Sequence, residues 1–207
     1  MRTSIYIDGF NLYYRALKGT AFKWLDLKQL AASLLPLSHQ IIAIKYFTAI
    51  VSGSIDPHQP NRQKAYIRAL QQHIPELTVH YGHFVTHVVR APHAPPTQPL
   101  TFAKVIKTEE KGSDVNLAVH LLNDAWNDVY DCAVVISNDS DFAEALRLVK
   151  EQNGKEIGII SPIIKGHPSY ELIRHASFVR RIRKGVLAAS QLPSPIPGTN
   201  LHKPSGW

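Results

Sequence analysis

The sequence predicts an α/β protein with three layers, α/β/α, around a mostly parallel, doubly wound sheet. Two observations predict this class. Short apolar runs with strand-like residues alternate along the chain with segments of helical period, and turn residues separate them. The chain has 207 residues, of which 44% are hydrophobic, which is enough for one domain with a sizeable core. Sheets of this kind carry their sites at the carboxyl ends of strands, where the strand order reverses.

The first part of the chain contains the first two strands and three helical segments. Residues 4–7 are a short buried strand that stops at Asp8, and residues 11–17 allow one or two helical turns. Residues 25–35 have apolar side chains at helical spacing and stop before Pro36. Residues 41–51 are rich in β-branched and aromatic side chains, which favours a strand, and a helix follows over 60–74.

The middle of the chain combines a strand, a proline-rich segment and the clearest helix. Residues 77–89 read as a strand interrupted at Gly82, and residues 90–108, with four prolines, read as a long functional loop. Residues 113–129 are predicted to form a helix with one apolar stripe. The stripe consists of Val115, Val119, Leu122, Trp126 and Val129.

The last part of the chain repeats the alternation. Residues 132–137 form a buried strand, residues 142–152 a helix that closes at Gly154, and residues 155–160 another strand. A short helix over 169–176 and a last strand over 178–182 complete the domain, which we place at residues 1–184. Residues 185–207 form a proline-rich tail in which we expect no regular structure.

Several classes of protein are excluded by composition. A single cysteine, Cys132, forms no internal disulfide and no cysteine-based zinc cluster, as is usual in a reducing cytoplasm. The first residues lack a signal peptide, and the longest apolar stretch, residues 41–51, contains Lys45 and is too short for a membrane span. We therefore expect a cytoplasmic protein without a membrane partner. No Walker loop or G-x-S-x-G elbow occurs.

Four aspartates stand at strand ends or helix starts. Asp8 follows the first strand, Asp114 opens the clearest helix, and Asp139 and Asp141 follow the strand 132–137. Any one of them could serve only as a helix cap. If the two strands are neighbours, all four converge on one pocket, and clustered carboxylates favour a divalent cation. Oxygen ligands suit Mg²⁺ or Mn²⁺, which can activate water for phosphodiester hydrolysis.

Three segments carry a resemblance to a known family. Tyr6-Ile7-Asp8-Gly9-Phe10-Asn11-Leu12, Glu110-Lys111-Gly112-Ser113-Asp114-Val115 and Ser137-Asn138-Asp139-Ser140-Asp141-Phe142 follow one another in the order and spacing of an NYN domain. The chain resembles the LabA-like branch of the PIN-like nuclease superfamily from about residue 5 to residue 182. The resemblance implies a PIN-like α/β fold and a metal-dependent ribonuclease site. The positions that match the family's acids and its polar position are Asp8, Asp114, Asp139, Asp141 and Asn11.

The sequence departs from the family at two positions. Asn138 stands where the family usually has glycine, a substitution that a left-handed backbone would tolerate. Ala176-Ser177-Phe178 replaces the family's Ala-Asp-Phe, and we expect the lost acid to lie outside the metal site.

Roles follow residue by residue as hypotheses. Asp8, Asp114 and Asp139 would hold Mg²⁺ or Mn²⁺ directly or through water, and Asp141 would be a fourth ligand or would orient water. Asn11 and Ser137 would hydrogen-bond to these acids or contact phosphate. Two readings stay open for Lys111, which either reaches the scissile phosphate or is merely solvated. Glu109 and Glu110 are expected to be solvated loop acids.

The charge is divided unevenly along the chain. The formal net charge is +7, with a pI near 9.5. Residues 109–156 hold 11 acids and 4 bases, a balance of −7, so the remainder carries 19 bases and 5 acids, a balance of +14. A basic surface beside an acidic centre suits an RNA backbone. The candidate RNA-binding residues are Arg90, Lys104, Lys107, Arg180 and Arg181.

A group of histidines, His80, His83, His87 and His93, suggests a zinc site. On a strand, His83 and His87 would be about 13 Å apart, too far to share one ion. Contact with RNA is the better interpretation.

The sequence therefore predicts a metal-dependent ribonuclease whose partner is RNA. Two alternatives stay open: an RNA-binding or regulatory module with little or no turnover, and a phosphatase that acts on small molecules. The RNA sequence, the endo- or exonucleolytic mode and the oligomeric state are also open, and a homodimer is compatible with the sequence.

Overall fold

A computed structural model describes residues 1–53, 56–205 and 207. Its centre is a six-stranded sheet in the order β3-β2-β1-β6-β7-β8, in which every neighbouring pair is parallel. The predicted strands are confirmed with small shifts of their ends. Their bounds are β1 (Arg2–Asp8), β2 (Gln40–Thr48), β3 (Leu77–Tyr81), β6 (Cys132–Ile136), β7 (Glu156–Ser161) and β8 (Phe178–Arg181).

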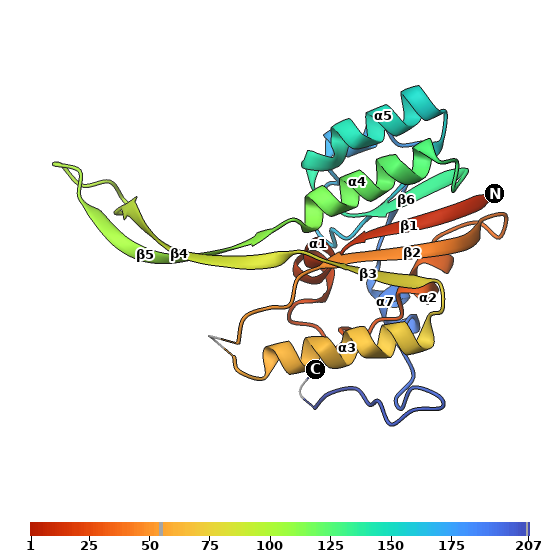
Figure 1. The fold of residues 1–207 in the computed structure, drawn as a ribbon, viewed down its shortest axis with the longest axis horizontal. Helices are drawn as coiled ribbons and strands as arrows, with labels where there is room; N and C mark the ends of the chain where they lie inside the picture. Colours follow the sequence, from red (N-terminus) through yellow and green to blue (C-terminus); the bar gives the residue numbers. More distant parts are fainter. Residues whose placement is uncertain (54–55, 206) are drawn as a thin grey trace.

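Helices cover both faces of the sheet, which confirms the three-layer arrangement (Figure 1). One face carries α1 (Gly9–Leu12), the π-helical turn η1 (Tyr13–Leu17), α2 (Leu27–Ala32), α3 (Gln59–His73) and α7 (Lys184–Ala189). The other carries α4 (Ser113–Trp126), the turn η2 (Ser140–Phe142), α5 (Ala143–Asn153) and α6 (Tyr170–Ile173). Side chains of the central strands alternate between the two cores, because successive residues of a strand point to opposite faces. Ile5 and Ile7 pack on the α3 side, and Tyr6 packs on the α4 side.

The strand order reverses between β1 and β6. From β1 the chain winds outward through β2 to β3, and from β6 it winds outward through β7 to β8. Ile7 is paired with Ile136, so Asp8 and Ser137 follow at the same level of the sheet. The neighbouring position of these strands, on which the convergence of the aspartates depends, is therefore confirmed.

The prediction of a loop over residues 90–108 is wrong for most of this segment. β4 (His83–Pro92) pairs with β5 (Phe102–Lys111) as an antiparallel ribbon, from His83 opposite Lys111 to Pro92 opposite Phe102. Only residues 93–101, which contain three of the four prolines, connect the strands. We call residues 83–111 the arm, because they project from the body of the protein (Figure 1).

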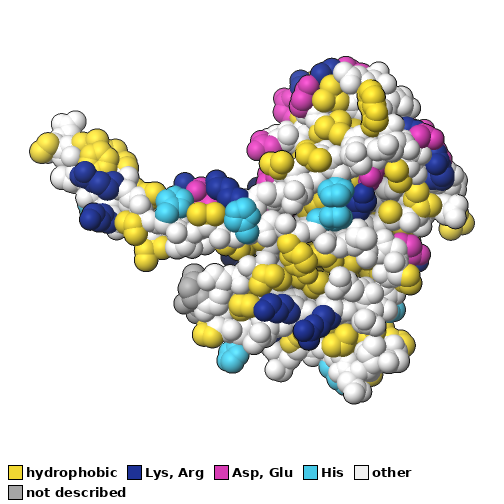
Figure 2. Space-filling view, in the orientation of Figure 1, with side chains coloured by type: hydrophobic (Ala, Val, Ile, Leu, Met, Phe, Trp, Pro, Cys, Tyr) yellow, Lys and Arg dark blue, Asp and Glu magenta, His cyan; other side chains and the backbone are white. Residues whose placement is uncertain are grey.

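The helix α4 is confirmed, but most of its predicted apolar stripe faces solvent, and of the five residues only Leu122 packs against the core. Val115, Val119 and Trp126 are 65%, 57% and 78% exposed. Leu117, Leu121 and Ala125, which lie on another face of the helix, are buried instead. Figure 2 shows hydrophobic side chains gathered on the surface of this upper part of the molecule. The buried face also contains Asp124, whose charge is matched by Lys45.

The tail is more ordered than expected. Its first residues form α7, whereas we expected no regular structure after residue 184. Leu192 and Ile196 are buried in the core on the α3 side. The indole of Trp24 donates a 3.0 Å hydrogen bond to the carbonyl of Pro193, and Leu25 forms a β-bridge with Gln191. Residues after 184 thus pack on the domain even though the segment contains four prolines.

Within residues 1–53, 56–205 and 207, no helix is both long and apolar enough to cross a membrane.

Candidate functional site

The first acid stands where β1 turns into α1. Asp8 ends β1 and caps α1, since its carboxylate accepts a 2.9 Å hydrogen bond from the backbone N–H of Asn11. Gly9 makes the turn possible: a Cβ there would lie 2.7 Å from the carbonyl oxygen of Phe47 and 2.8 Å from the Tyr46 ring. The sequence Asp-Gly thus directs a buried carboxylate to the carboxyl end of the sheet.

The second element of the site is the segment after β6. The Ser137 hydroxyl donates a 2.9 Å hydrogen bond to the carboxylate of Asp8 and accepts one of 3.0 Å from the N–H of Asp139. The amide oxygen of Asn11 accepts a 3.1 Å hydrogen bond from the N–H of Asn138. These bonds lock α1 to the segment after β6. Asn11 and Ser137 therefore lie beside Asp8, as predicted, although their roles stay predictions.

The third element is the junction of the arm and α4. Asp114 lies in the first turn of α4, where the helix dipole favours a negative charge. Glu110, near the end of β5, accepts hydrogen bonds of 3.0 Å from the N–H and 2.7 Å from the hydroxyl of Ser113. Gly82 allows β5 to approach this closely, because a Cβ there would overlap the Glu110 carboxylate. Glu110 is therefore fixed at the site, whereas we expected a solvated loop acid.

Three of the four predicted aspartates line one open hollow of about 450 Å³, namely Asp8, Asp114 and Asp139. Asp141 is not in its lining: it is exposed and borders the site, with its N–H bonded to the Asp139 carboxylate at 3.1 Å. Lys111 is 55% exposed and lies 3.7 Å from Glu109, outside the lining. Its reach to a phosphate stays a prediction.

The surroundings disfavour ionisation of two of these acids. Burial raises the pKa of Asp8 to about 6, and the charges of Asp114 and Asp139 act in the same direction, against the hydrogen bonds from Asn11 and Ser137. Burial also raises the pKa of Asp114, and nearby Asp139, Glu110 and Asp141 contribute. The acids therefore repel one another across the hollow.

The donor set fits a hard divalent cation. Carboxylate oxygens are its ligands of choice, and in the described residues no Lys or Arg forms an ion pair with Asp8, Asp114, Asp139 or Asp141. Across the same described ranges, no three His, Cys, Asp or Glu side chains are arranged to hold an ion by themselves. Water or phosphate oxygens would have to complete the coordination, as is usual for Mg²⁺.

The candidate RNA-binding residues lie in two separate places. Arg90, Lys104 and Lys107 are on the arm, where Lys107 pairs with Glu109 at 2.8 Å and Arg90 lies over the Phe102 ring. Figure 2 shows Lys and Arg side chains along this arm. Arg180 and Arg181 are on β8, at the edge of the sheet and separated from β1 by β7 and β6. The structure thus brings only the first group to the element that joins the site.

The two departures from the family pattern have structural explanations. Asn138 is not among the described residues with a left-handed backbone, so glycine is not required there. Its amide oxygen instead accepts a 2.9 Å hydrogen bond from the N–H of Ser169 and one of 3.2 Å from Ser161. Ser177 exchanges hydrogen bonds with Ile157 near the start of β7, at the opposite end of the sheet from the aspartates.

The histidines are distributed over different elements. His83 and His87 lie on β4, as expected for a strand, and His93 follows it. His80, on β3, stacks on Phe47 and contacts the ring of His120, with centroids 4.1 Å apart. His120 in turn lies 3.4 Å from the Lys45 ammonium, which pairs with Asp124. Contact of this group with RNA stays a prediction.

Some residues of the site were missed by the sequence analysis. Glu110, Arg15 and Phe84 line the hollow, and the Phe84 ring of the arm packs edge-on against Phe10 of α1. Phe10 also lines a second cavity on the other side of α1, lined by aromatic side chains. The position of Glu110 three residues before an expected helix was the one available signal.

Comparisons with known proteins concern the family and the fold of this chain. The NYN domain profile matches residues 2–182. A curated protein from Pseudomonas putida, 6-hydroxy-3-succinoylpyridine 3-monooxygenase HspA, is 35% identical over an alignment that covers all of this chain and 75% of that protein. A crystal structure of VPA0982, a protein of unknown function from Vibrio parahaemolyticus, superposes with a TM-score of 0.55. It is 16% identical and covers 88% of this chain and 93% of its own, which supports the fold alone.

Proposed function

Because this chain belongs to the NYN domain family, we propose that it is a divalent-metal-dependent ribonuclease that hydrolyses phosphodiester bonds of RNA. The family suggests a nuclease-like function. The observation that carries the finer proposal is the meeting of Asp8, Asp114 and Asp139 at the switch point of the sheet, without a cationic side chain paired to any of them in the described residues. A cytoplasmic location is part of the same proposal.

Each part of the site has a task in this proposal. Asp8, Asp114 and Asp139 would hold Mg²⁺ or Mn²⁺, which when bound lowers the pKa of water and neutralises charge on a phosphodiester. Ser137 and Asn11 keep the carboxylate of Asp8 in one orientation. Asp141, at the rim, would be a fourth ligand or would orient water. The cations of the arm would bind the RNA backbone.

The test is cleavage of single-stranded RNA with Mn²⁺ by the wild type and by Asp139→Asn. An asparagine keeps the oxygen that accepts the N–H of Asp141 and removes only the charge, so we expect folded protein with at least about a hundredfold lower activity. Asp128→Asn is a matched control, because Asp128 is 71% exposed and has a left-handed φ of 53° that asparagine tolerates. Equal cleavage by wild type and Asp139→Asn would refute the proposal.

The same experiment separates the alternatives. RNA binding in EDTA without cleavage after Mn²⁺ is added would indicate a regulatory module, and hydrolysis of small phosphoesters but not RNA would indicate a phosphatase. Metal binding by calorimetry provides a readout that does not depend on activity.

A second candidate function is the oxidation of a small pyridine, which the name of the Pseudomonas putida relative specifies for that protein. The observation that favours it is the aromatic-lined cavity next to the acidic hollow. It is tested by incubating the protein with 6-hydroxy-3-succinoylpyridine, oxygen and a two-electron reductant. Loss of the pyridine without RNA cleavage would favour this function over the nuclease.

A further inference from the structure

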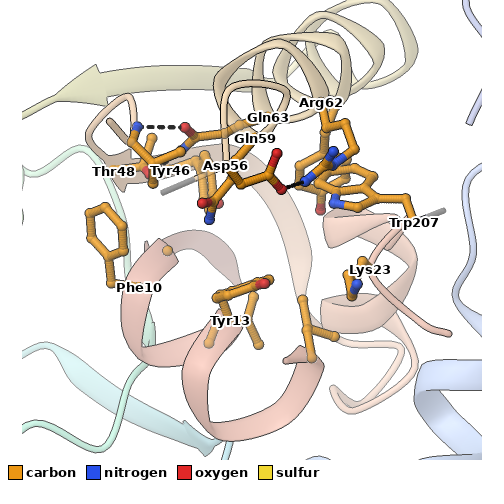
Figure 3. Close-up of a pocket in the computed structure, with 15 residues that line it drawn as sticks. Phe10, Tyr13, Lys23, Tyr46, Thr48, Asp56, Gln59, Arg62, Gln63 and Trp207 are labelled. Atoms are coloured by element: carbon orange, nitrogen blue, oxygen red, sulfur yellow. Dashed lines mark hydrogen bonds and ion pairs between the residues drawn. The ribbon is translucent and has the colours of Figure 1, made fainter. Parts of the chain in front are cut away.

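A second cavity lies beside the acidic hollow, on the opposite side of α1. Its volume is about 240 Å³, and residues of α1, η1, β2 and α3 line it together with Lys23 and Trp207 (Figure 3). Phe10 lines both this cavity and the acidic hollow, so one side chain separates the two. The volume is below the 300 to 1,000 Å³ that is common for drug-sized ligands, so a molecule of one or two rings would fit.

The walls of the cavity are aromatic and are held in place. Phe10, Tyr13, Tyr46, Tyr66 and Trp207 line it, and the rings of Tyr66 and Trp207 contact each other with centroids 5.1 Å apart. The Tyr66 hydroxyl donates a 2.7 Å hydrogen bond to the carbonyl of Leu25, so its polar atom is already satisfied. Such walls favour a flat, aromatic ligand, because rings gain from edge and face contacts beyond the area that they bury.

Other lining groups are fixed by hydrogen bonds within the protein. The Gln63 side chain donates to the carbonyl of Ala49 at 2.9 Å and accepts from the N–H of Val51 at 2.9 Å. Figure 3 shows the bond from the N–H of Val51 to Gln63 at one side of the cavity, with Gln59 directed towards its centre. No side-chain hydrogen bond of Gln59 occurs within residues 1–53, 56–205 and 207, so its amide is available to a polar atom of a ligand. The cavity is therefore preformed.

The charge of the lining is positive. Arg62 and Asp56 form an ion pair with each other across the rim (Figure 3). Lys23 has no ion pair or side-chain hydrogen bond in the part of the chain that the structure describes, and it lines the same cavity. The three charged groups leave one positive charge, which belongs to Lys23, and an anionic group of a ligand would neutralise it.

We propose that this cavity binds a small planar aromatic carboxylate, with the ring between the tyrosine and phenylalanine walls and the carboxylate at Lys23. The inference does not depend on the nuclease proposal, since it uses neither the aspartates nor a metal, but it rests on the same cavity as the second candidate function and specifies its class of ligand. An RNA strand is too large for the volume, so the site and the acidic hollow have different ligands. Phe10 lines both sites, so the occupant of the cavity would lie on the other side of this ring from the acidic hollow.

The test is a titration with pyridine-3-carboxylate in EDTA, followed by tryptophan fluorescence and by calorimetry. EDTA removes metal from the acidic hollow, so that binding there cannot be mistaken for binding in the cavity. We expect saturable binding at a 1:1 ratio. The uncharged isostere pyridine-3-carboxamide should bind at least about tenfold more weakly, because it lacks the charge-assisted contact.

Two substitutions locate the site. Lys23→Gln should weaken binding of pyridine-3-carboxylate at least about tenfold and leave the carboxamide unchanged, since only the charge is lost. Lys64→Gln, an exposed lysine on α3 outside the cavity, is the matched control and should change affinity less than about twofold. Val51→Trp, which fills the cavity, should abolish binding of both probes, and circular dichroism checks its fold.

The proposal is overturned if pyridine-3-carboxylate does not bind at concentrations up to about 10 mM, since specific recognition requires a stronger affinity than this. It is also overturned if the carboxamide binds with equal affinity, or if Lys23→Gln binds pyridine-3-carboxylate as well as the wild type does. If RNA cleavage fails while pyridine-3-carboxylate binds, the nuclease proposal is refuted and the cavity is retained. If RNA is cleaved but pyridine-3-carboxylate does not bind, the cavity proposal is refuted and the nuclease proposal is retained.

Discussion

The hydroxyl of Ser137 donates a hydrogen bond of 2.9 Å to the carboxylate of Asp8, although 129 positions separate the two residues in the chain. The bond joins the ends of β1 and β6, the two strands between which the sheet reverses its order. It holds the most buried acid of the site in a fixed orientation, and the same hydroxyl accepts the N–H of Asp139.

Removing this hydroxyl is expected to weaken metal binding. In Ser137→Ala, Asp8 loses its orienting donor, and the N–H of Asp139 loses its acceptor. We expect Mn²⁺ affinity, measured by calorimetry, to fall by about tenfold to a hundredfold. Ser190→Ala is the control, because Ser190 is also buried and its hydroxyl has no partner among the described residues. Equal losses in the two variants would mean that the effect is not specific to the site.

Replacing Asp8 is expected to stabilise the metal-free protein. The raised pKa of about 6 means that the ionised carboxylate costs free energy in the folded state at neutral pH. At pH 7.5 in EDTA, Asp8→Asn should increase the free energy of unfolding by about 1 to 2 kcal/mol. Chemical denaturation measures the change, with Glu156→Gln as control, because Glu156 is an exposed acid without an ion pair among the described residues.

Adding Mn²⁺ should reverse the order of stability. The wild type gains about 2.7 kcal/mol at a hundredfold excess over its dissociation constant, whereas Asp8→Asn gains little. If both proteins respond equally to Mn²⁺, Asp8 is not a metal ligand.

The contact between His80 and His120 predicts a loss of stability in mild acid. Burial lowers the pKa of both imidazoles, and for His80 the charges of His120 and Lys45 lower it further against the effect of Asp124. The unfolded chain therefore binds protons more tightly than the native state, so stability falls as pH drops through about 6.5. Urea unfolding at pH 7.5 and at pH 5.5 measures this loss.

The control for this experiment takes account of Asp8. Its raised pKa acts in the opposite direction, because the folded state binds that proton more tightly, so all proteins should carry Asp8→Asn. Adding His120→Gln should reduce the difference between the two pH values, and adding His202→Gln, on an exposed residue, should not. An unchanged difference with His120→Gln would contradict the assignment.

The cations of the arm are expected to affect RNA binding and not the chemical step. Arg90 and Lys104 are cross-strand partners on the arm. Replacing both with glutamine should reduce the dependence of log affinity on log salt by about 1.4 for single-stranded RNA. The double control is Lys64→Gln with Arg68→Gln on α3, and filter binding at several salt concentrations measures the slopes. The arm has no role in binding if the slope stays that of the wild type.

The strands could be predicted because buried parallel strands are continuous runs of apolar, β-branched residues, whereas their order in the sheet could not. Asp8 and Asp139 could be placed for the same reason, since the residue after such a strand lies at the edge of the sheet. Because β1 and β6 are neighbours in the sheet, Asp8 and Asp139 converge.

The arm could not be predicted from the prolines alone. Pro92 ends β4 and the other three lie in the connection, so they interrupt the ribbon only at its tip. Val88 and Ile106, cross-strand partners, are 64% and 76% exposed, because a ribbon of two strands has no core to bury them. The burial pattern that normally identifies a strand is therefore absent.

The predicted orientation of α4 was wrong because apolar side chains alone do not show which face of this helix is buried. Two apolar stripes exist on this helix, and the more conspicuous one, with Val115 and Trp126, faces solvent. The other buries Asp124, whose carboxylate accepts a 2.6 Å hydrogen bond from the Tyr6 hydroxyl. A charged residue on a buried face is unexpected until its partners from β1 and β2 are known.

Gly112 joins the arm to α4 as a single residue, with Glu110 on one side and Asp114 on the other. Each residue advances an α-helix by about 100°, so inserting one residue at this junction would turn Asp114 away from Asp8 while leaving both elements intact. The number of residues in this connection is therefore fixed by the direction in which Asp114 has to point. The arm can therefore change in length at its tip, by pairs of residues. Where it joins α4, the number of residues has to stay the same.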